Sequence, residues 1–330
     1  MADPAVERPK VTRAPPPGRP LISRGAVGFG WRGKEVPLGS LILQLIINGI
    51  LAGALYAAIA VGLGLVFGIM KVINFAHGTF LMISMYLGFW IWTFWGLEPY
   101  LSMLMIIPVL FVLGYLIEGY LIEPVFKKEH SDVREPMGVL LLTCGLGLAL
   151  NNTALLLFTA NQRNLEIPIS TMAFEFGEVV VSVPRLIAFL GAVLVTVLLY
   201  QFMNRTMIGK AINATSQDRE AARLIGIDDY KLYRLSFALN TTMVGIAGAL
   251  LLPFFVVFPE VGELFSMKSF IVVVLGGVGS IPGVILGGLV VGLIESFGTQ
   301  FVSALGAEVT IFAIFISLLL MRPKGLLGKE

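Results

Sequence analysis

The chain has 330 residues, of which 57% are apolar and only 13% are charged, and its mean hydropathy is +0.89. Soluble domains carry roughly 25% charged residues, so this composition excludes an ordinary soluble protein. The net charge of +2 excludes little, because the distribution of charge between the two sides of a membrane is more informative than its sum. The single cysteine, Cys144, excludes an intrachain disulfide, and two histidines alone cannot form a metal site.

Residues 1–37 form a basic, proline-rich tail with seven prolines, seven Lys or Arg and three acidic residues. Repeated prolines prevent a helix, and few apolar residues are available for a core. No apolar segment of the kind found in signal peptides follows the early charges. The sequence therefore predicts a disordered, basic cytoplasmic tail over 1–37.

Long uncharged runs begin at Leu38, and they determine the fold class. A helix needs about 20 apolar residues to cross the hydrocarbon core of a bilayer. A membrane barrel would instead alternate in segments of about ten residues. The sequence therefore predicts an all-α, polytopic transmembrane helical bundle. The runs are Leu38–Met70, Gly78–Leu97, Pro99–Ile117, Pro136–Ala160, Leu186–Asn204, Ser236–Pro259 and Ser269–Ile294.

A polar cluster, Asn74-Phe75-Ala76-His77-Gly78, interrupts the first apolar region. Polar side chains at membrane depth are costly and usually face a bundle interior or a cavity. Asn74 and His77 are therefore candidates for the substrate pathway. The alternative is that they bond across helices and hold a helix break in place, which the neighbouring Gly78 favours.

Residues 161–184 contain Glu166, Glu175 and Glu178 and alternate in hydrophobicity. This pattern predicts a small β-hairpin on the outer face.

The segment 204–235 carries many charges between two apolar runs and is expected on the cytoplasmic side. Thr215, Ser216 and Asp218 can each cap a helix start. A short amphipathic helix should follow over 219–225, and Gly226 is placed to end it in a left-handed conformation.

The C-terminal half contains a second break, at Gly276, Gly277, Gly279 and Pro282. Glu295 follows inside an apolar run and is the third pathway candidate, with an interfacial position as the alternative. The two breaks resemble the paired discontinuous helices of transporters.

The charges of the connecting segments predict which side each one faces. Basic segments belong inside, and acidic or neutral ones, which include residues 259–268, belong outside. The stretches 41–95 and 269–321 then need an odd number of crossings each. Three short spans in each give ten in total, and re-entrant breaks would give eight, with the amino terminus outside.

The sequence lacks the motifs of an ATP-hydrolysing or catalytic chain. It has no Gly-x-x-x-x-Gly-Lys-Ser/Thr motif and no nucleophile, base and orienting group in one region. We therefore expect a non-enzymatic chain that binds neither a cofactor nor a metal, so any dependence on ATP would come from partner chains.

Three motifs carry a family resemblance. The residues Glu220-Ala221-Ala222, followed by Gly226, match the EAA-x-x-x-G core of the loop with which ABC importer permeases contact their ATPases. Gly53-x-x-Tyr56-Ala57 and the Asn74–Gly78 cluster resemble the signature of branched-chain amino acid permeases. The resemblance spans Leu41 to Gly325, although the hydrophobic-Pro ending of the longer EAA pattern is missing.

The resemblance implies a permease domain over 38–325, a cytoplasmic end at 326–330 and a multi-pass location in a bacterial inner membrane. It implies two cytoplasmic ABC ATPases, a second homologous permease in a heterodimer and an extracytoplasmic solute-binding protein, but no nucleic acid. The residues that would couple this chain to the ATPases are Asp218, Glu220, Ala221, Ala222 and Gly226. The expected solute is an aliphatic amino acid, an amide or urea.

The alternative function is an autonomous secondary transporter or channel. Discontinuous helices suit that class too, and Glu295 would be its best candidate for an ion site. A carrier of this kind would transport solute when reconstituted alone.

Overall fold

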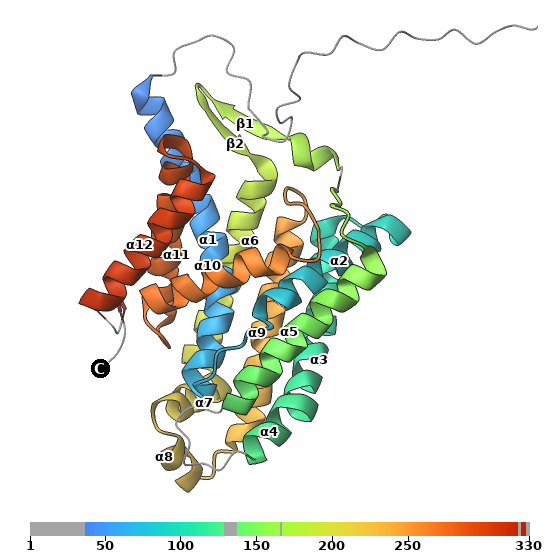
Figure 1. Cartoon of the computed structure of the whole chain (residues 1–330), viewed down its shortest axis with the longest axis vertical. Coiled ribbons are helices and arrows are strands. Elements are labelled where there is room, and N and C mark those ends of the chain that lie inside the picture. The colour runs from blue at the N-terminus through green and yellow to red at the C-terminus, as the bar shows by residue number, and fades with distance from the viewer. Residues whose placement is uncertain (1–36, 129–136, 166, 323–324, 328–330) are drawn as a thin grey trace, which may run out of the picture. The chain divides into compact units, whose positions relative to one another are not determined.

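The computed structural model describes residues 37–128, 137–165, 167–322 and 325–327. Helices dominate these ranges, together with one small sheet (Figure 1). In chain order the elements are α1 (Leu38–Met70), α2 (His77–Trp95), α3 (Pro99–Ile117), the π-helix η1 (Glu118–Ile122), α4 (Glu123–Lys128), α5 (Met137–Phe158), the 3-10 helix η2 (Pro168–Thr171), β1 (Ala173–Phe176), β2 (Val179–Ser182), α6 (Val183–Arg205), α7 (Met207–Gln217), α8 (Arg219–Leu224), α9 (Asp229–Leu251), α10 (Val261–Gly276), α11 (Ile281–Phe301) and α12 (Ala304–Met321).

Within the described ranges, eight helices are long and apolar enough to cross a membrane. One of them is the continuous rod Pro99–Lys128, in which η1 joins α3 to α4. The predicted polytopic helical bundle with discontinuous helices is confirmed, and the chain is a multi-pass membrane protein.

The expectation of three short spans within 41–95 is wrong. One 33-residue helix, α1, fills most of this stretch and α2 fills the rest. The glycines of α1 do not break it, because neighbouring backbones pack against them. A Cβ added at Gly53 would meet the Gly288 carbonyl oxygen and the Leu289 Cα at 2.8 Å. The small residues therefore mark a tight interface between α1 and α11.

The stretch 269–321 likewise holds two long helices, α11 and α12, after the end of α10. α10 has 16 residues and is too short to count as a candidate span. The count of eight agrees with the lower of the two numbers that the charge distribution allowed.

The two ends of α1 lie on opposite sides of the bundle. Near its start, Gln44 accepts a hydrogen bond from the Val180 amide at 2.8 Å and donates one to the Val180 carbonyl at 2.9 Å. At its end, Gly68 faces Asn213 of α7 across a small hollow. Since α6 separates β2 from α7, Leu38 lies on the side of the hairpin and opposite α7 and α8 (Figure 1).

That arrangement favours the eight-span alternative, in which the amino terminus is outside. The two expectations for the amino terminus therefore conflict, because eight spans place it outside whereas the tail was expected in the cytoplasm; residues 1–36 themselves fall outside the described residues.

The expected hairpin is present as β1 and β2, with Phe174 opposite Val181 and Phe176 opposite Val179. Gly177 occupies the tight turn with φ of 66°.

Two backbone hydrogen bonds close the second helix break. The Leu326 amide donates to the Leu275 carbonyl at 2.9 Å, and the Leu327 amide donates to the Gly276 carbonyl at 3.1 Å. The last carbonyls of a helix have no partner within it. The segment 325–327 therefore caps the C-terminus of α10.

Candidate functional site

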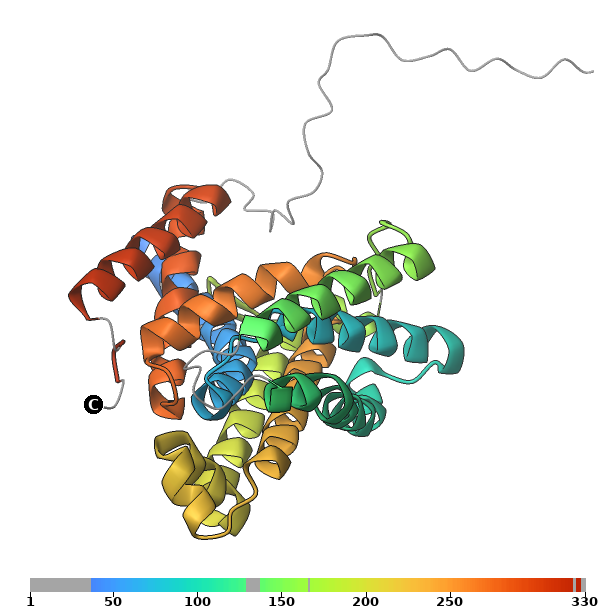
Figure 2. The ribbon, with the colours of Figure 1, turned by 60° about the horizontal axis from the view of Figure 1, so that its bottom comes forward.

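α7 and α8 form a compact unit (Figure 2), which lies at the side of the bundle opposite the hairpin (Figure 1). Each helix begins with a side-chain cap. The Thr206 hydroxyl accepts from the Gly209 amide at 3.0 Å, and the Asp218 carboxylate accepts from the Ala221 amide at 2.9 Å. Gly226 follows α8 with φ of 86°, a conformation that suits glycine.

Sequence reasoning predicted α8, its cap at Asp218 and its end at Gly226, but it missed α7. Thr215 and Ser216 lie inside α7 and start no helix. Two signals could have indicated α7: Thr206 as its cap, and the apolar spacing of Ile208, Ala211 and Ile212.

Asp229 anchors α8 to the start of α9. Its Oδ2 accepts hydrogen bonds from Arg219 Nε at 2.6 Å and from Arg223 Nη2 at 2.8 Å. The hydrogen bond to Asp229 raises the pKa of the Arg223 guanidinium above its ordinary value. The Asp229 side chain is only 5% exposed, so both arginines compensate a nearly buried carboxylate.

Aromatic rings pack against the guanidinium of Arg219. Its guanidinium carbon lies 5.3 Å from the ring centre of Tyr233 and 5.8 Å from that of Phe126. Tyr233 belongs to α9 and Phe126 to α4. The orientation of α8 is therefore tied to two membrane helices.

The residues expected to contact an ATPase lie mostly on the surface. Asp218, Glu220, Ala221 and Gly226 are exposed, whereas Ala222 is buried against the unit. The tip of α8 also presents Leu224 and Ile225, which are 89% and 76% exposed. Two large apolar side chains at the tip of a charged helix are typical of a protein contact.

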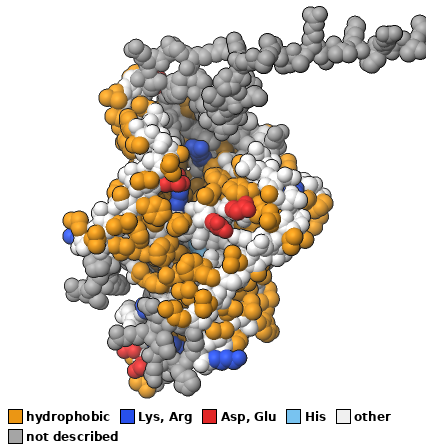
Figure 3. All heavy atoms as spheres, viewed as in Figure 1, with side chains coloured by type: hydrophobic (Ala, Val, Ile, Leu, Met, Phe, Trp, Pro, Cys, Tyr) orange, Lys and Arg blue, Asp and Glu red, His pale blue; other side chains and the backbone are white. Residues whose placement is uncertain are grey.

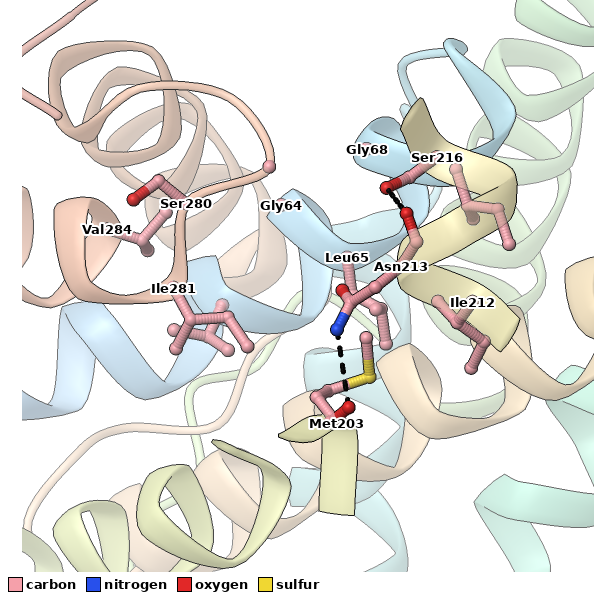
Figure 4. A pocket seen from close by; sticks show the side chains of 13 residues that line it. Gly64, Leu65, Gly68, Met203, Ile212, Asn213, Ser216, Ser280, Ile281 and Val284 are labelled. Carbon is pink, nitrogen blue, oxygen red and sulfur yellow. Dashed lines mark hydrogen bonds between the residues drawn. The ribbon is translucent and has the colours of Figure 1, made fainter. Parts of the chain in front are cut away.

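A small hollow of about 40 Å³ lies between α1, α7 and the start of α11 (Figure 4). Its polar side chains are engaged within the chain: Asn213 Nδ2 donates to the Met203 carbonyl, and the Ser280 hydroxyl accepts from the Gly283 amide. Gly68 and Gly279, beside the two helix breaks, also line it. The hollow therefore lies where α7 meets both helix breaks.

The first helix break lies between α1 and α2. Lys71 has φ of 56°, and α2 begins at His77. Asn74 Oδ1 accepts a hydrogen bond from the Ala76 amide at 3.0 Å, which shapes the turn. His77 is fully buried near Asn240 of α9, and Gly78 packs against the Gly262 backbone of α10.

The second break lies between α10 and α11. Gly276 is the last residue of α10, and Pro282 lies in the first turn of α11. Between the helices, Gly277 and Gly279 have φ of 102° and 78°.

The three pathway candidates do not form one cluster. Asn74 and His77 belong to the first break, whereas Glu295 of α11 bonds Lys268 of α10 at 2.6 Å. Sequence reasoning missed Lys268, since it placed residues 259–268 in an outer loop. The lone lysine before an uncharged run was the available signal. Among the described residues, no group of His, Cys, Asp and Glu could hold a metal ion.

Comparisons with known proteins agree with the motifs. A family model described as the branched-chain amino acid transport system permease component matches residues 45–321. The permease BraD of Pseudomonas aeruginosa, from a high-affinity branched-chain amino acid transport system, is 33% identical over 87% of this chain and 96% of its own. LivH of Escherichia coli, described in the same words, is 30% identical over the same shares.

A probable branched-chain amino acid permease, LivH of Methanocaldococcus jannaschii, is 30% identical over 84% of this chain and 88% of its own. No significant match was found among solved structures.

Proposed function

This chain belongs to the family of branched-chain amino acid transport permeases, and from that premise we propose that it is the membrane-spanning subunit of an ATP-driven importer. Its solute would be a branched-chain amino acid or a related small solute such as an amide or urea. The observation that carries the proposal is the exposed tip of α8, which carries the EAA core and two uncovered apolar side chains.

The tip of α8 would contact one of two cytoplasmic ATPases. Leu224 and Ile225 supply apolar area, and Glu220 supplies a charge beside it. α7 and α8 would therefore face the cytoplasm of a bacterial cell, and the hairpin would face the solute-binding protein outside the inner membrane. A second, homologous permease would complete the transmembrane pathway.

Asp229 would transmit a movement of α8 to the membrane helix α9. When the ATPases close on ATP, a push on α8 would pass through Arg219 and Arg223 to Asp229 at the start of α9. Opening of the bundle toward the outside would follow, as alternating access requires.

Purification of the tagged chain from its native membrane tests the assembly. We expect a P-loop ATPase to accompany the wild type and to be lost in Glu220→Lys and Leu224→Glu. Both side chains are exposed, so neither change should prevent folding. Glu175→Lys in β1 is the matched control, because it makes the same charge change at an exposed site on the opposite side.

ATP-dependent uptake by the same variants tests the coupling. Glu220→Lys and Gly226→Arg should insert normally but separate ATP hydrolysis from uptake. Normal uptake in Glu220→Lys, Leu224→Glu and Gly226→Arg together would refute the coupling role. Ion-driven transport by the chain reconstituted alone would replace the importer by a secondary carrier.

A further inference from the structure

A charged pair lies inside the membrane-spanning part of the chain. Lys268 Nζ of α10 is 2.6 Å from Glu295 Oε1 of α11, and it donates to the Tyr56 hydroxyl of α1 at 3.3 Å. Tyr56 is buried, and its ring centre lies 5.1 Å from the ammonium. Three helices thus contribute to one polar site, and Figure 3 shows charged side chains set within a largely hydrophobic face of the molecule.

The packing of these helices has close contacts besides the pair. α11 contacts α1 through Gly288 and Gly292, and it contacts α10 where Gly283 meets Gly276. A buried ion pair often stabilises a fold no better than apolar side chains of similar size. Ionised side chains at membrane depth usually mark a pathway for a polar solute.

The pair keeps one free donor and one free acceptor. A lysine ammonium has three N–H groups, and within the described residues two of them are used, by Glu295 and by Tyr56. Glu295 Oε2 accepts no hydrogen bond from any described residue, although it is shielded from solvent. The side chains of Lys268 and Glu295 remain 19% and 27% exposed, so the site lies at an accessible edge.

We propose that Lys268, Glu295 and Tyr56 bind the two charged groups of a zwitterionic amino acid as it crosses the membrane. The inference rests on the proposed import function and deepens it. The third Lys268 N–H donates to the carboxylate of the solute, and Glu295 Oε2 accepts from its ammonium. Both solute charges are then paired, which offsets the cost of removing them from solvent.

Leu264 supplies the apolar contact for the solute side chain. It lies one helical turn before Lys268 on the same face of α10 and is 47% exposed. An aliphatic side chain placed there would shield Leu264 while the charged groups reach the pair. The site therefore favours branched aliphatic zwitterions over amides or urea, which carry no opposite charges.

Uptake of labelled L-leucine into liposomes tests the site, using the full complex with ATPases and loaded binding protein. In Lys268→Met/Glu295→Gln, which keeps the volumes and removes both charges, we expect uptake to fall at least tenfold. ATP hydrolysis stimulated by the binding protein should remain, since it reports assembly and coupling. Uptake equal to that of the wild type would overturn the inference.

The exchanged pair, Lys268→Glu/Glu295→Lys, distinguishes a ligand site from an ion pair that only holds α10 against α11. A purely structural ion pair would be restored by the exchange. A ligand site would not be, because interchanging the two charges beside a fixed side-chain contact inverts the handedness of the solute that fits. Restored L-leucine uptake would therefore contradict the inference.

Tyr56→Phe tests the ligand site if the double variants do not assemble. It removes one hydroxyl and keeps the ring, so it should lower uptake several-fold without changing the affinity for the binding protein. Unchanged uptake would overturn the site. Failure of the wild-type complex to import any branched-chain amino acid would instead refute the proposed function, which keeps the two failures distinct.

Discussion

The interface between α1 and α11 and the junction between α8 and α9 are held by different forces. Between α1 and α11, Gly49 and Gly53 face Gly288 and Gly292 so closely that an added Cβ would meet backbone atoms. Between α8 and α9, Asp229 receives Arg219 and Arg223 at 2.6 and 2.8 Å. The first contact is steric, and the second is electrostatic.

The difference follows from the surroundings, which are lipid for α1 and α11 and water for α8. Apolar side chains gain little by leaving lipid for a protein interior, so helices in a bilayer associate through close packing. At the water-facing end, ion pairs can form and break at modest cost and are weakened by salt. α1 and α11 are therefore suited to move as one rigid body, and α8 is suited to adjust while it stays attached.

The largest effect should come from filling the steric interface. Gly53→Leu would force α1 away from α11 and should lower the free energy of unfolding by about 3 kcal/mol or more, because a packed core cannot absorb the added volume. Thermal unfolding of the purified protein measures the loss. Gly39→Leu is the matched control, since a Cβ there meets nothing within 4 Å. Equal losses in both variants would show that the interface is not tight.

Removing the shared carboxylate should have the next largest effect. Asp229→Asn would leave Arg219 and Arg223 without their counter-charge, and we expect a cost of roughly 1–2 kcal/mol, reduced because both arginines are partly exposed. Amide hydrogen exchange should accelerate in α8 and stay unchanged in α11. Uniform acceleration along the chain would mean that the junction is not local.

Removing one arginine at a time should cost less, because both share the same oxygen of Asp229. We expect roughly 0–1 kcal/mol for Arg219→Gln or Arg223→Gln. The double variant should lose more than the sum, since the second removal leaves Asp229 unpaired. Simple additivity in a double-mutant cycle would show that the two pairs act independently.

The smallest effect should come from the pH dependence of the α9 cap. Asp228 accepts from the Lys231 amide at 3.3 Å, and its ion pair with the Lys231 side chain lowers the pKa of the carboxyl below its ordinary value. A lowered folded-state pKa means that the stabilisation is complete above the unfolded pKa, near 4, and is lost as pH falls through the folded value.

We expect about 1 kcal/mol or less for this cap, because the Asp228 side chain is 46% exposed. Amide hydrogen exchange in the first turn of α9, measured between pH 6 and pH 2, reports the fraying of that turn and so tests this value. Asp228→Asn keeps a capping side chain without the titration, so its fraying should depend less on pH in this range than that of the wild type.

The sequence predicted the features that depend on neighbouring residues. Asp218 caps α8, Gly226 ends it, and the alternation around Gly177 forms the hairpin, because each depends on a few consecutive residues. The two helix breaks also lie where glycine, proline and polar residues gather.

Features that depend on distant partners were missed or misplaced. The charges of the connecting segments suggested three short spans within 41–95, and only the packing of α1 against the backbone of α11 identifies the partner of the α1 glycines. Lys268 was placed in an outer loop, because its partner Glu295 lies 27 residues later and α10 had no clear start signal. Neither partner could be identified from spacing along the chain.

The hydrogen bonds from Leu326 and Leu327 to the end of α10 have a consequence for biosynthesis. Residues 325–327 are synthesised after α12, so this cap forms only after every candidate span of the described residues has been made. The junction between α10 and α11 is therefore completed late in synthesis. A polypeptide truncated after Met321 would insert all eight candidate spans and still leave this junction uncapped.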